Sequence, residues 1–473
     1  MITEKDKIKH LHNRAAFGVT MNDWQTKTNL KNCITDLLKT PVKYTYLYTI
    51  TKDEVDAAKE KIKNLSKEDK KDLKQLLKEN VRELNNLWLN EMIHSPAQLN
   101  EKMAFFWHGH FACRSANPYF DQQYLDIIRK HALGNFSTML NEIAKTPAML
   151  QYLNNQQNKK DHPNENFARE VMELFTLGRG NYTEQDVKEA ARAFTGFAFD
   201  KTGEFKFRKQ LHDFDQKIFQ GKTGNFSGED ILQIILAKKE CAYFITKKIF
   251  KFFVNDIIDE EKVTQLADKF YQSNYDIKSL MTTIFSSDWF YDEKNIGAKI
   301  KSPIELLAGM FRVIPTAFKD NESTLFIQRA LGQILLNPPN VAGWNGGRSW
   351  IDSSSLLFRM QLPQVIYFDK EVSVEPKEIT PESKQEMQLM MTESYIKKLA
   401  SKKLNAQADW TTIINYFSKI DTVENEMSSL LLSKKIDAST IKIIKANTDN
   451  TSKEATIKKT FINILSLPEY QLC

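Results

Sequence analysis

Glycine and proline are both scarce in this chain of 473 residues, which contains only 16 and 13 of them. Proteins built from β-strands need many turn residues, so this scarcity argues against an all-β fold. Hydrophobic residues make up 41% of the chain, which is enough for real cores. The composition therefore predicts a folded, mostly α-helical protein, a multi-helical array with orthogonal or bundle-like packing.

Cysteine is also rare, and no two cysteines are close in sequence. Cys33, Cys113, Cys241 and Cys473 form no CxxC pair, which argues against both a disulfide framework and a cysteine-based zinc site. The segment Met1 to His10 lacks the apolar stretch of a secretory signal, and no run is long and apolar enough to span a membrane. We therefore expect a cytoplasmic protein, unless a signal-bearing partner exports it.

The charges do not suggest a nucleic-acid-binding protein. The net charge of +6 is small beside 66 basic and 60 acidic side chains. Lysines alternate with carboxylates at helical spacing, as in residues 59–78, which is typical of solvated helix faces.

Helical periodicity runs along most of the chain. A polar linker from Asp369 to Ser383 separates an expected helical core at 1–365 from a Lys-rich helical region at 366–473, which we expect to pack on the core. Apolar and polar residues alternate from Phe199 to Phe207, and this pattern predicts at most one small β-hairpin.

All eight histidines lie between His10 and His212. The most informative pair is His108 and His110, on either side of Gly109. If a helix ended at Gly109, the following residues could turn back and both imidazoles could bind one metal ion. The alternative is that His108 caps the helix while His110 packs among aromatic side chains.

A second segment, residues 164–174, carries closely spaced charges. Glu170 and Glu173 are three residues apart on an expected helix and share a face. Apolar neighbours indicate that the helix is largely covered, and buried carboxylates need partners or a metal. Arg169, however, lies four residues from both Glu165 and Glu173, so a ladder of ion pairs explains the same pattern.

Two further features carry polar side chains that could act together. In Thr183 to Gly196, Thr183 and Asp186 have the form of a capping box, and Arg192 could pair with a carboxylate of another helix. His212 and Asp213 are adjacent, as in a ligand pair or a general base with an acidic neighbour.

The one Gly/Pro-rich loop is Asn337 to Trp350. Its Asn340 and Trp344 could cover a site or bind a flat ligand such as a sugar ring. The alternative is a structural loop held in place by its two tryptophans.

Together these segments resemble the bacterial family catalogued as domain of unknown function 1800 (DUF1800). The resemblance spans nearly the whole chain. The segments that carry it are HLHNRAAFG (10–18), FFWHGHF (105–111), NENFAREVMELFTLG (164–178), YTEQDVKEAARAFTG (182–196), HD (212–213), NPPNVAGWNGG (337–347) and LSLPEYQ (465–471). The resemblance implies a mostly helical protein without an established activity. Many members are exported and are often encoded beside a sulfatase-like protein with a twin-arginine signal.

Two functional hypotheses follow. The first is a metal-dependent hydrolase or oxidoreductase acting on a small molecule or glycan. Its metal would be Zn, Fe or Mn. The metal ligands would be His108, His110, Glu170, Glu173 and His212. The catalytic residues would be Glu170, Glu173, Arg169, His212 and Asp213. The residues that bind substrate would be Arg192, Trp344 and Asn340. The second is a non-catalytic partner or scaffold of a sulfatase-like protein, in which the same residues form ion pairs that fix the helix packing.

Overall fold

The computed structural model describes residues 2–39, 45–54, 67–115, 117–368, 404–449 and 451–473. Most of these residues lie in helices, so the predicted mostly α-helical fold is confirmed. No helix among the described residues is both long enough and apolar enough to cross a membrane.

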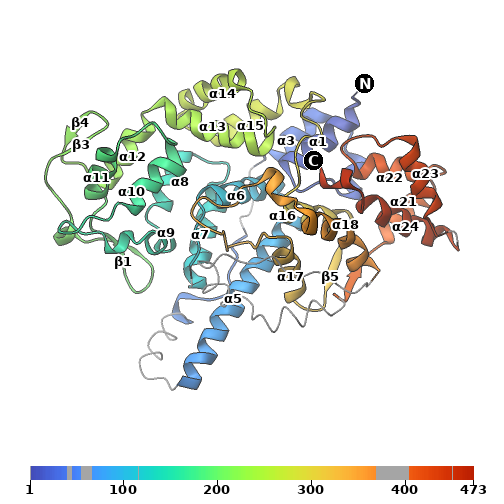
Figure 1. Ribbon diagram of the computed structural model, residues 1–473, viewed down its shortest axis with the longest axis horizontal. Coiled ribbons are helices and arrows are strands. Elements are labelled where there is room, and N and C mark those ends of the chain that lie inside the picture. The colour runs from blue at the N-terminus through green and yellow to red at the C-terminus, as the bar shows by residue number, and fades with distance from the viewer. Residues whose placement is uncertain (1, 40–44, 55–66, 116, 369–403, 450) are drawn as a thin grey trace.

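Helix α6 of the N-terminal part lies near the middle of the molecule (Figure 1), where it contacts α1, α5 and α7. The helices of this part are α1 (Glu4–Ala15), α2 (Met21–Thr26), α3 (Leu30–Leu37), α5 (Lys67–His94), α6 (Gln98–His110), α7 (Pro118–His131), α8 (Phe136–Ile143) and α9 (Pro147–Tyr152). Helix α5 extends beyond the rest of the molecule (Figure 1).

The middle of the chain forms one end of the molecule and the row of helices above α6 (Figure 1). Its elements are the 3-10 helix η1 (Asn155–Gln157), α10 (Asn166–Glu170), the π-helix η2 (Val171–Thr176), α11 (Glu184–Ala193), the 3-10 helix η3 (Lys209–Leu211), α12 (Gly228–Leu236), α13 (Lys239–Phe253), α14 (Glu260–Gln272), α15 (Ile277–Phe285) and the 3-10 helix η4 (Asp288–Tyr291).

The last part returns to the centre and then forms the opposite end of the molecule (Figure 1). Its helices are α16 (Pro303–Val313), α17 (Glu322–Ala330), the 3-10 helix η5 (Gly347–Trp350), α18 (Ser353–Tyr367), α21 (Thr411–Phe417), α22 (Val423–Leu431), α23 (Ala438–Ala446), α24 (Lys453–Leu465) and the 3-10 helix η6 (Pro468–Gln471). The predicted boundary after residue 365 falls within α18, and the whole predicted linker, residues 369–383, lies outside the described residues.

Six of the described helices begin with a complete capping box, in which a hydroxyl and a carboxylate satisfy backbone N–H groups of the first turn. The pairs are Thr3–Asp6, Thr20–Asp23, Thr183–Asp186, Ser227–Asp230, Ser302–Glu305 and Asp352–Ser355. The third of these pairs is the box expected from the sequence.

The predicted hairpin is present as β1 (Phe197–Phe199) paired with β2 (Phe205–Phe207). Two more antiparallel pairs were not expected. One joins β3 (Lys217–Phe219) to β4 (Lys222–Gly224), and the other joins β5 (Thr316–Phe318) to β6 (Ala406–Ala408). The last pair links chain segments about 90 residues apart, which no local sequence pattern can indicate.

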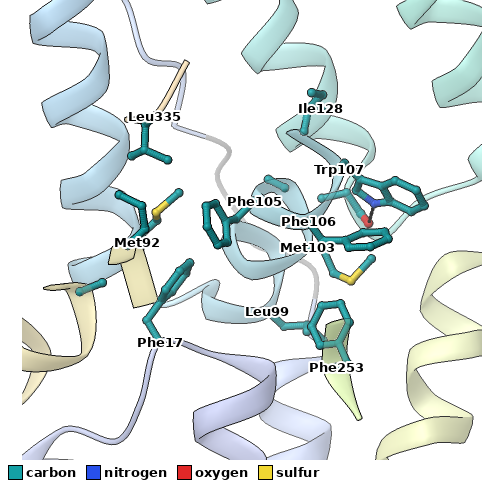
Figure 2. Packing of buried hydrophobic residues seen from close by; sticks show 14 of the residues in the cluster. Phe17, Met92, Leu99, Met103, Phe105, Phe106, Trp107, Ile128, Phe253 and Leu335 are labelled. Atoms are coloured by element: carbon teal, nitrogen blue, oxygen red, sulfur yellow. Dashed lines mark hydrogen bonds between the residues drawn. The ribbon is translucent and has the colours of Figure 1, made fainter. Parts of the chain in front are cut away.

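Helix α6 is buried on all of its faces, with only Gly109 partly exposed. Phe105 packs on one side against Phe17 of the α1–α2 connection, with ring centroids 6.0 Å apart. Phe106 packs on another side against Phe253 of α13 at 6.1 Å (Figure 2). This helix therefore forms the centre of the hydrophobic core.

Because α6 is buried all round, its charged side chains need partners inside the protein. Glu101 accepts hydrogen bonds from Arg129 of α7 at 2.7 Å and from the Trp88 indole of α5 at 3.1 Å. Lys102 forms an ion pair with Glu305 of α16, and that charge lowers the pKa of Glu305 to about 2 against the opposing effect of burial. These contacts connect α6 to three neighbouring helices.

Candidate functional site

The helix does not end at Gly109, which was the condition for His108 and His110 to bind one metal ion. Helix α6 continues through Gly109 to His110, and the Phe111 N–H donates to the Trp107 carbonyl at 2.8 Å. Residues two apart on a continuous helix diverge by about 200°. His108 and His110 therefore face different parts of the core instead of one shared site.

His108 lies in an aromatic environment. Its ring meets the Trp88 ring edge-on at 5.1 Å and stacks on Trp344 at 5.6 Å. Neither ring nitrogen has a hydrogen-bond partner among the described residues, and burial lowers the pKa of His108 to about 3. The imidazole is therefore neutral and acts here as a packed ring. It does not cap the helix.

His110 lies on the other side, against the π-helix. Its Nε2 is 3.1 Å from the Phe175 carbonyl, and the Lys248 amine is 3.3 Å from its Nδ1. Since the amine donates to Nδ1, the proton is on Nε2 and is donated to the Phe175 carbonyl. Burial, with the nearby Lys248 charge, holds the pKa of His110 well below its usual value.

The π-helix Val171–Thr176 lies within the segment that carries the family resemblance. The Leu177 N–H donates to the Met172 carbonyl, five residues back, at 2.8 Å. Lys248 donates to the Leu174 carbonyl at 2.8 Å, so Lys248 and His110 together satisfy carbonyls of this segment. Sequence analysis missed Lys248, because a contact between residues 74 apart leaves no local signal.

Glu170 and Glu173 have different environments. Glu173 accepts hydrogen bonds from Arg179 Nε at 2.6 Å and from the Tyr182 hydroxyl at 2.7 Å, and these bonds lower its pKa. Glu170 is partly buried, and it forms neither a hydrogen bond nor an ion pair with the residues that the structure describes. Burial and the Glu173 charge raise the pKa of Glu170. The pKa values of the two carboxyl groups are thus shifted in opposite directions.

Arg169 is held by two carboxylates. It binds Glu184 through both terminal nitrogens, at 2.7 and 2.8 Å, and Glu165 at 3.1 Å. The expected pair with Glu165 is present, whereas Glu173 is bound by Arg179 instead. The Arg169–Glu184 pair joins the segment before the π-helix to the start of α11.

Arg192 joins α11 to the loop that carries His212 and Asp213. Its Nε donates to Asp213 at 2.7 Å, and its Nη1 donates to Glu189 at 2.9 Å. The hydrogen bonds to Arg192 lower the pKa of Asp213 against the opposing effect of burial. Arg192 does not reach Glu170 or Glu173.

His212 and Asp213 hold the end of α11. His212 Nδ1 donates to the Thr195 carbonyl at 2.8 Å, and the Asp213 N–H donates to the Thr195 hydroxyl at 2.8 Å. Gly196 adopts a φ of +81°, and a Cβ there would lie 2.7 Å from the Arg208 carbonyl oxygen. The pair therefore closes a tight turn, and the role of Thr195 was not foreseen.

The Gly/Pro-rich loop packs on α6. A Cβ at Gly343 would lie 2.4 Å from the carbonyl oxygen of Gly109, and Gly343 has a φ of +75°. Asn340 is exposed, and its side chain accepts from the Ala342 N–H at 2.9 Å. Trp344 stacks on His108, so one face of its ring is already occupied.

The described residues include no group of three or more His, Cys, Asp or Glu side chains placed to hold a metal ion. The proposed ligands have separate neighbours. His108 packs between tryptophans, His110 binds the π-helix, and His212 binds Thr195. In this conformation the predicted ligand set is not assembled.

A family model described as "Protein of unknown function (DUF1800)" matches residues 10–472. The chain belongs to the DUF1800 family. The comparisons with curated proteins and with solved structures found no match. All the segments that carried the resemblance lie within the matched range.

The His108 environment predicts a loss of stability in acid. In the unfolded chain His108 takes up a proton below pH 6.5, whereas in the folded state it does so only near pH 3. The contribution of His108 to the free energy of unfolding is therefore fully present above pH 6.5 and decreases as the pH falls. Between pH 7 and pH 5 we expect the titration of His108 to lower the free energy of unfolding by about 2 kcal/mol. Urea unfolding of H108F should show a pH dependence smaller by that amount, and the exposed-site variant H162F should match wild type.

The contact between Gly343 and Gly109 predicts unequal effects of two alanine substitutions. Gly346→Ala places a side chain in open space at a φ of +72°. It should lower the free energy of unfolding only by the backbone strain, about 1–3 kcal/mol. Gly343→Ala adds a collision with the α6 carbonyl and should lower the free energy of unfolding by more. Equal losses in urea unfolding would contradict the close contact.

Proposed function

We propose that this chain is a non-catalytic partner of a sulfatase-like protein, the kind of partner that family membership suggests. The observation that carries the proposal is a pair of exposed aromatic rings on either side of His212, Phe207 at the end of β2 and Phe214 directly after Asp213. The side chains of Phe207 and Phe214 are 37% and 55% exposed. Their rings lie 5.0 and 4.7 Å from the buried His212 ring.

This aromatic surface, Phe207 and Phe214 around His212, has the properties of a protein-binding site. A single exposed apolar side chain is ordinary, but two aromatic rings on a rigid support are typical of interface centres. Three exposed basic residues lie next to it in sequence, Lys206, Arg208 and Lys209. We therefore expect the partner to offer an apolar recess with an acidic rim.

The neighbouring charged groups support a binding role over a catalytic one. Arg169, Arg192, Glu173 and Asp213 each form at least one internal ion pair no longer than 2.7 Å. These groups are already engaged by internal partners, whereas a catalytic group must be available to substrate.

The test uses two exposed hydrophobic residues in different places. Phe214→Ser should weaken binding to a purified sulfatase-like protein from the same genome by about tenfold or more, because an aromatic anchor is lost. Ile257→Ser, at a residue 80% exposed after α13, should leave the dissociation constant unchanged. Biolayer interferometry would measure both. No binding by wild type, or equal loss in both variants, would contradict the proposal.

A second candidate function is a hydrolase that uses Glu170. A carboxyl group with a raised pKa beside one with a lowered pKa is the pattern of an acid and base pair. A π-helix, which often occurs at functional sites, follows Glu170 directly. This candidate does not require the metal ligand set described above.

The hydrolase candidate predicts that Glu170→Gln abolishes turnover without unfolding the protein. Activity would be measured on a panel of nitrophenyl esters, glycosides, phosphates and sulfates. We expect a loss of about 100-fold or more in this variant, because the proton donor is removed. Glu293→Gln, at an exposed carboxylate, serves as the control. A panel without turnover, or turnover that survives Glu170→Gln, would remove this candidate.

A further inference from the structure

A cavity of about 470 Å³ lies between α1, the start of α2, α3, the α5–α6 connection and α16. This volume is within the range of pockets that bind small molecules. None of the residues singled out in the sequence analysis for catalysis, metal binding or substrate binding lines this cavity. Helices α1, α3 and α16 also lie away from the β1–β2 pair that carries Phe207 (Figure 1). The cavity is therefore separate from the aromatic surface.

An incomplete ion pair, Asp23 of α2 and Arg312 of α16, lies on the cavity wall. Arg312 Nη2 is 3.7 Å from Asp23 Oδ2, which is too far for a hydrogen bond. The guanidinium is held in place because its Nε and Nη1 donate to the carbonyls of Gly18 and Ile93, at 3.0 and 2.7 Å. Its Nη2 forms no hydrogen bond with the residues that the structure describes. The donors of Nη2 therefore remain available.

Asp23 is bonded through only one of its carboxylate oxygens. Oδ2 accepts from the Thr20 N–H at 3.0 Å and from the Thr20 hydroxyl at 2.8 Å, whereas Oδ1 has no hydrogen bond within the described part of the chain. The side chains of Asp23 and Arg312 are 16% and 6% exposed, and neither Oδ1 nor Arg312 Nη2 is sealed from solvent. Each charged group thus has one free polar atom that a molecule in the cavity can reach.

A second pair of charges lies on the same wall. Lys27 donates to Asp36 at 2.7 Å, and its ammonium keeps further N–H donors. Burial lowers the pKa of His12 to about 4, and the charges of Asp23, Arg312, Lys27 and Asp36 all act on this ring in addition. The two cations and two carboxylates therefore gather around one part of the cavity, where neither sign of charge is in excess.

The rest of the wall is largely apolar. Five side chains with hydrocarbon or thioether surfaces line the cavity beside the charged groups, namely Met21, Leu37, Ile93, Phe311 and Val313. An apolar part of a ligand would be removed from water here. The cavity thus offers adjacent charges of opposite sign together with an apolar surface.

We propose that this cavity binds a free α-amino acid with an apolar side chain. Its carboxylate would accept from Arg312 Nη2 and Lys27, and its ammonium would donate to Asp23 Oδ1. One carbon atom separates the two charged groups of an α-amino acid, so they can meet the neighbouring Asp23 and Arg312 at the same time.

The charge arrangement selects against other small ligands. A largely buried ion pair is favourable only when its remaining polar atoms are also satisfied, and a zwitterion satisfies both partners. A simple anion would meet the like charge of Asp23, and a simple cation would meet that of Arg312. This site goes beyond the proposed partner role and does not depend on it.

Two cavity variants, each with a matched control, test the proposal. Asp23→Asn removes the negative charge and keeps an acceptor for the capping box. Asp230→Asn makes the same change in the capping box of α12, away from the cavity. Asn22→Trp places a large ring at an exposed position that lines the cavity, and Asn32→Trp places it at an exposed position of α3 that does not.

Calorimetry would measure the binding of leucine, methionine and phenylalanine. The analogues 4-methylpentanoate and 3-methylbutylamine are leucine without its ammonium and without its carboxylate. We expect at least one amino acid to bind wild type and both controls equally. Asp23→Asn and Asn22→Trp should weaken that binding by about tenfold or more, and both analogues should bind wild type more weakly than leucine by a similar factor.

Three results would overturn the proposal. They are no binding of any of the three amino acids to wild type, binding that survives Asp23→Asn or Asn22→Trp, and an analogue that binds as tightly as leucine. If Asp23→Asn does not fold, the comparison of Asn22→Trp with Asn32→Trp decides the result.

Discussion

The burial of α6 on all of its faces is the constraint on which the rest of the structure depends. A helix without a solvent-facing side must find internal partners for each polar group that it carries. Glu101 and Lys102 meet Arg129 and Glu305 of two other helices. At its end, His110 reaches the π-helix carbonyl of Phe175. The packing of at least three helices is therefore specified by the polar groups of one.

The same constraint explains why family segments that lie far apart in sequence pack together around α6. The Gly109 carbonyl leaves no room for a side chain at Gly343, so the Gly/Pro-rich loop lies directly on α6. Trp344 then covers His108. From the other side of α6, His110 supports the segment that contains Glu170 and Glu173. Several residues of the predicted site thus make contacts inside one core.

The part of the molecule around α11 follows a similar principle on a smaller scale. Arg169–Glu184 and Arg192–Asp213 tie α11 to its two neighbouring segments. Because His212 and Asp213 are fixed on Thr195, the exposed rings of Phe207 and Phe214 sit on a rigid base. A rigid aromatic surface loses little conformational entropy on binding, which is why it suits a docking role.

The sequence by itself determined the helical class, the capping box at Thr183, the hairpin near 199–207 and the family, because these depend on composition, local periodicity and the order of short segments. It could not determine whether α6 stops at Gly109, because glycine permits either outcome; in the folded protein the helix continues to His110. Nor could it find Glu184 as a partner of Arg169, Asp213 as a partner of Arg192, or the Phe175 carbonyl as the partner of His110, since local spacing along the chain sets none of these contacts. Tertiary structure alone brought Lys248 to the π-helix and Arg312 to Asp23, because both placements join segments that have no local relation in the chain.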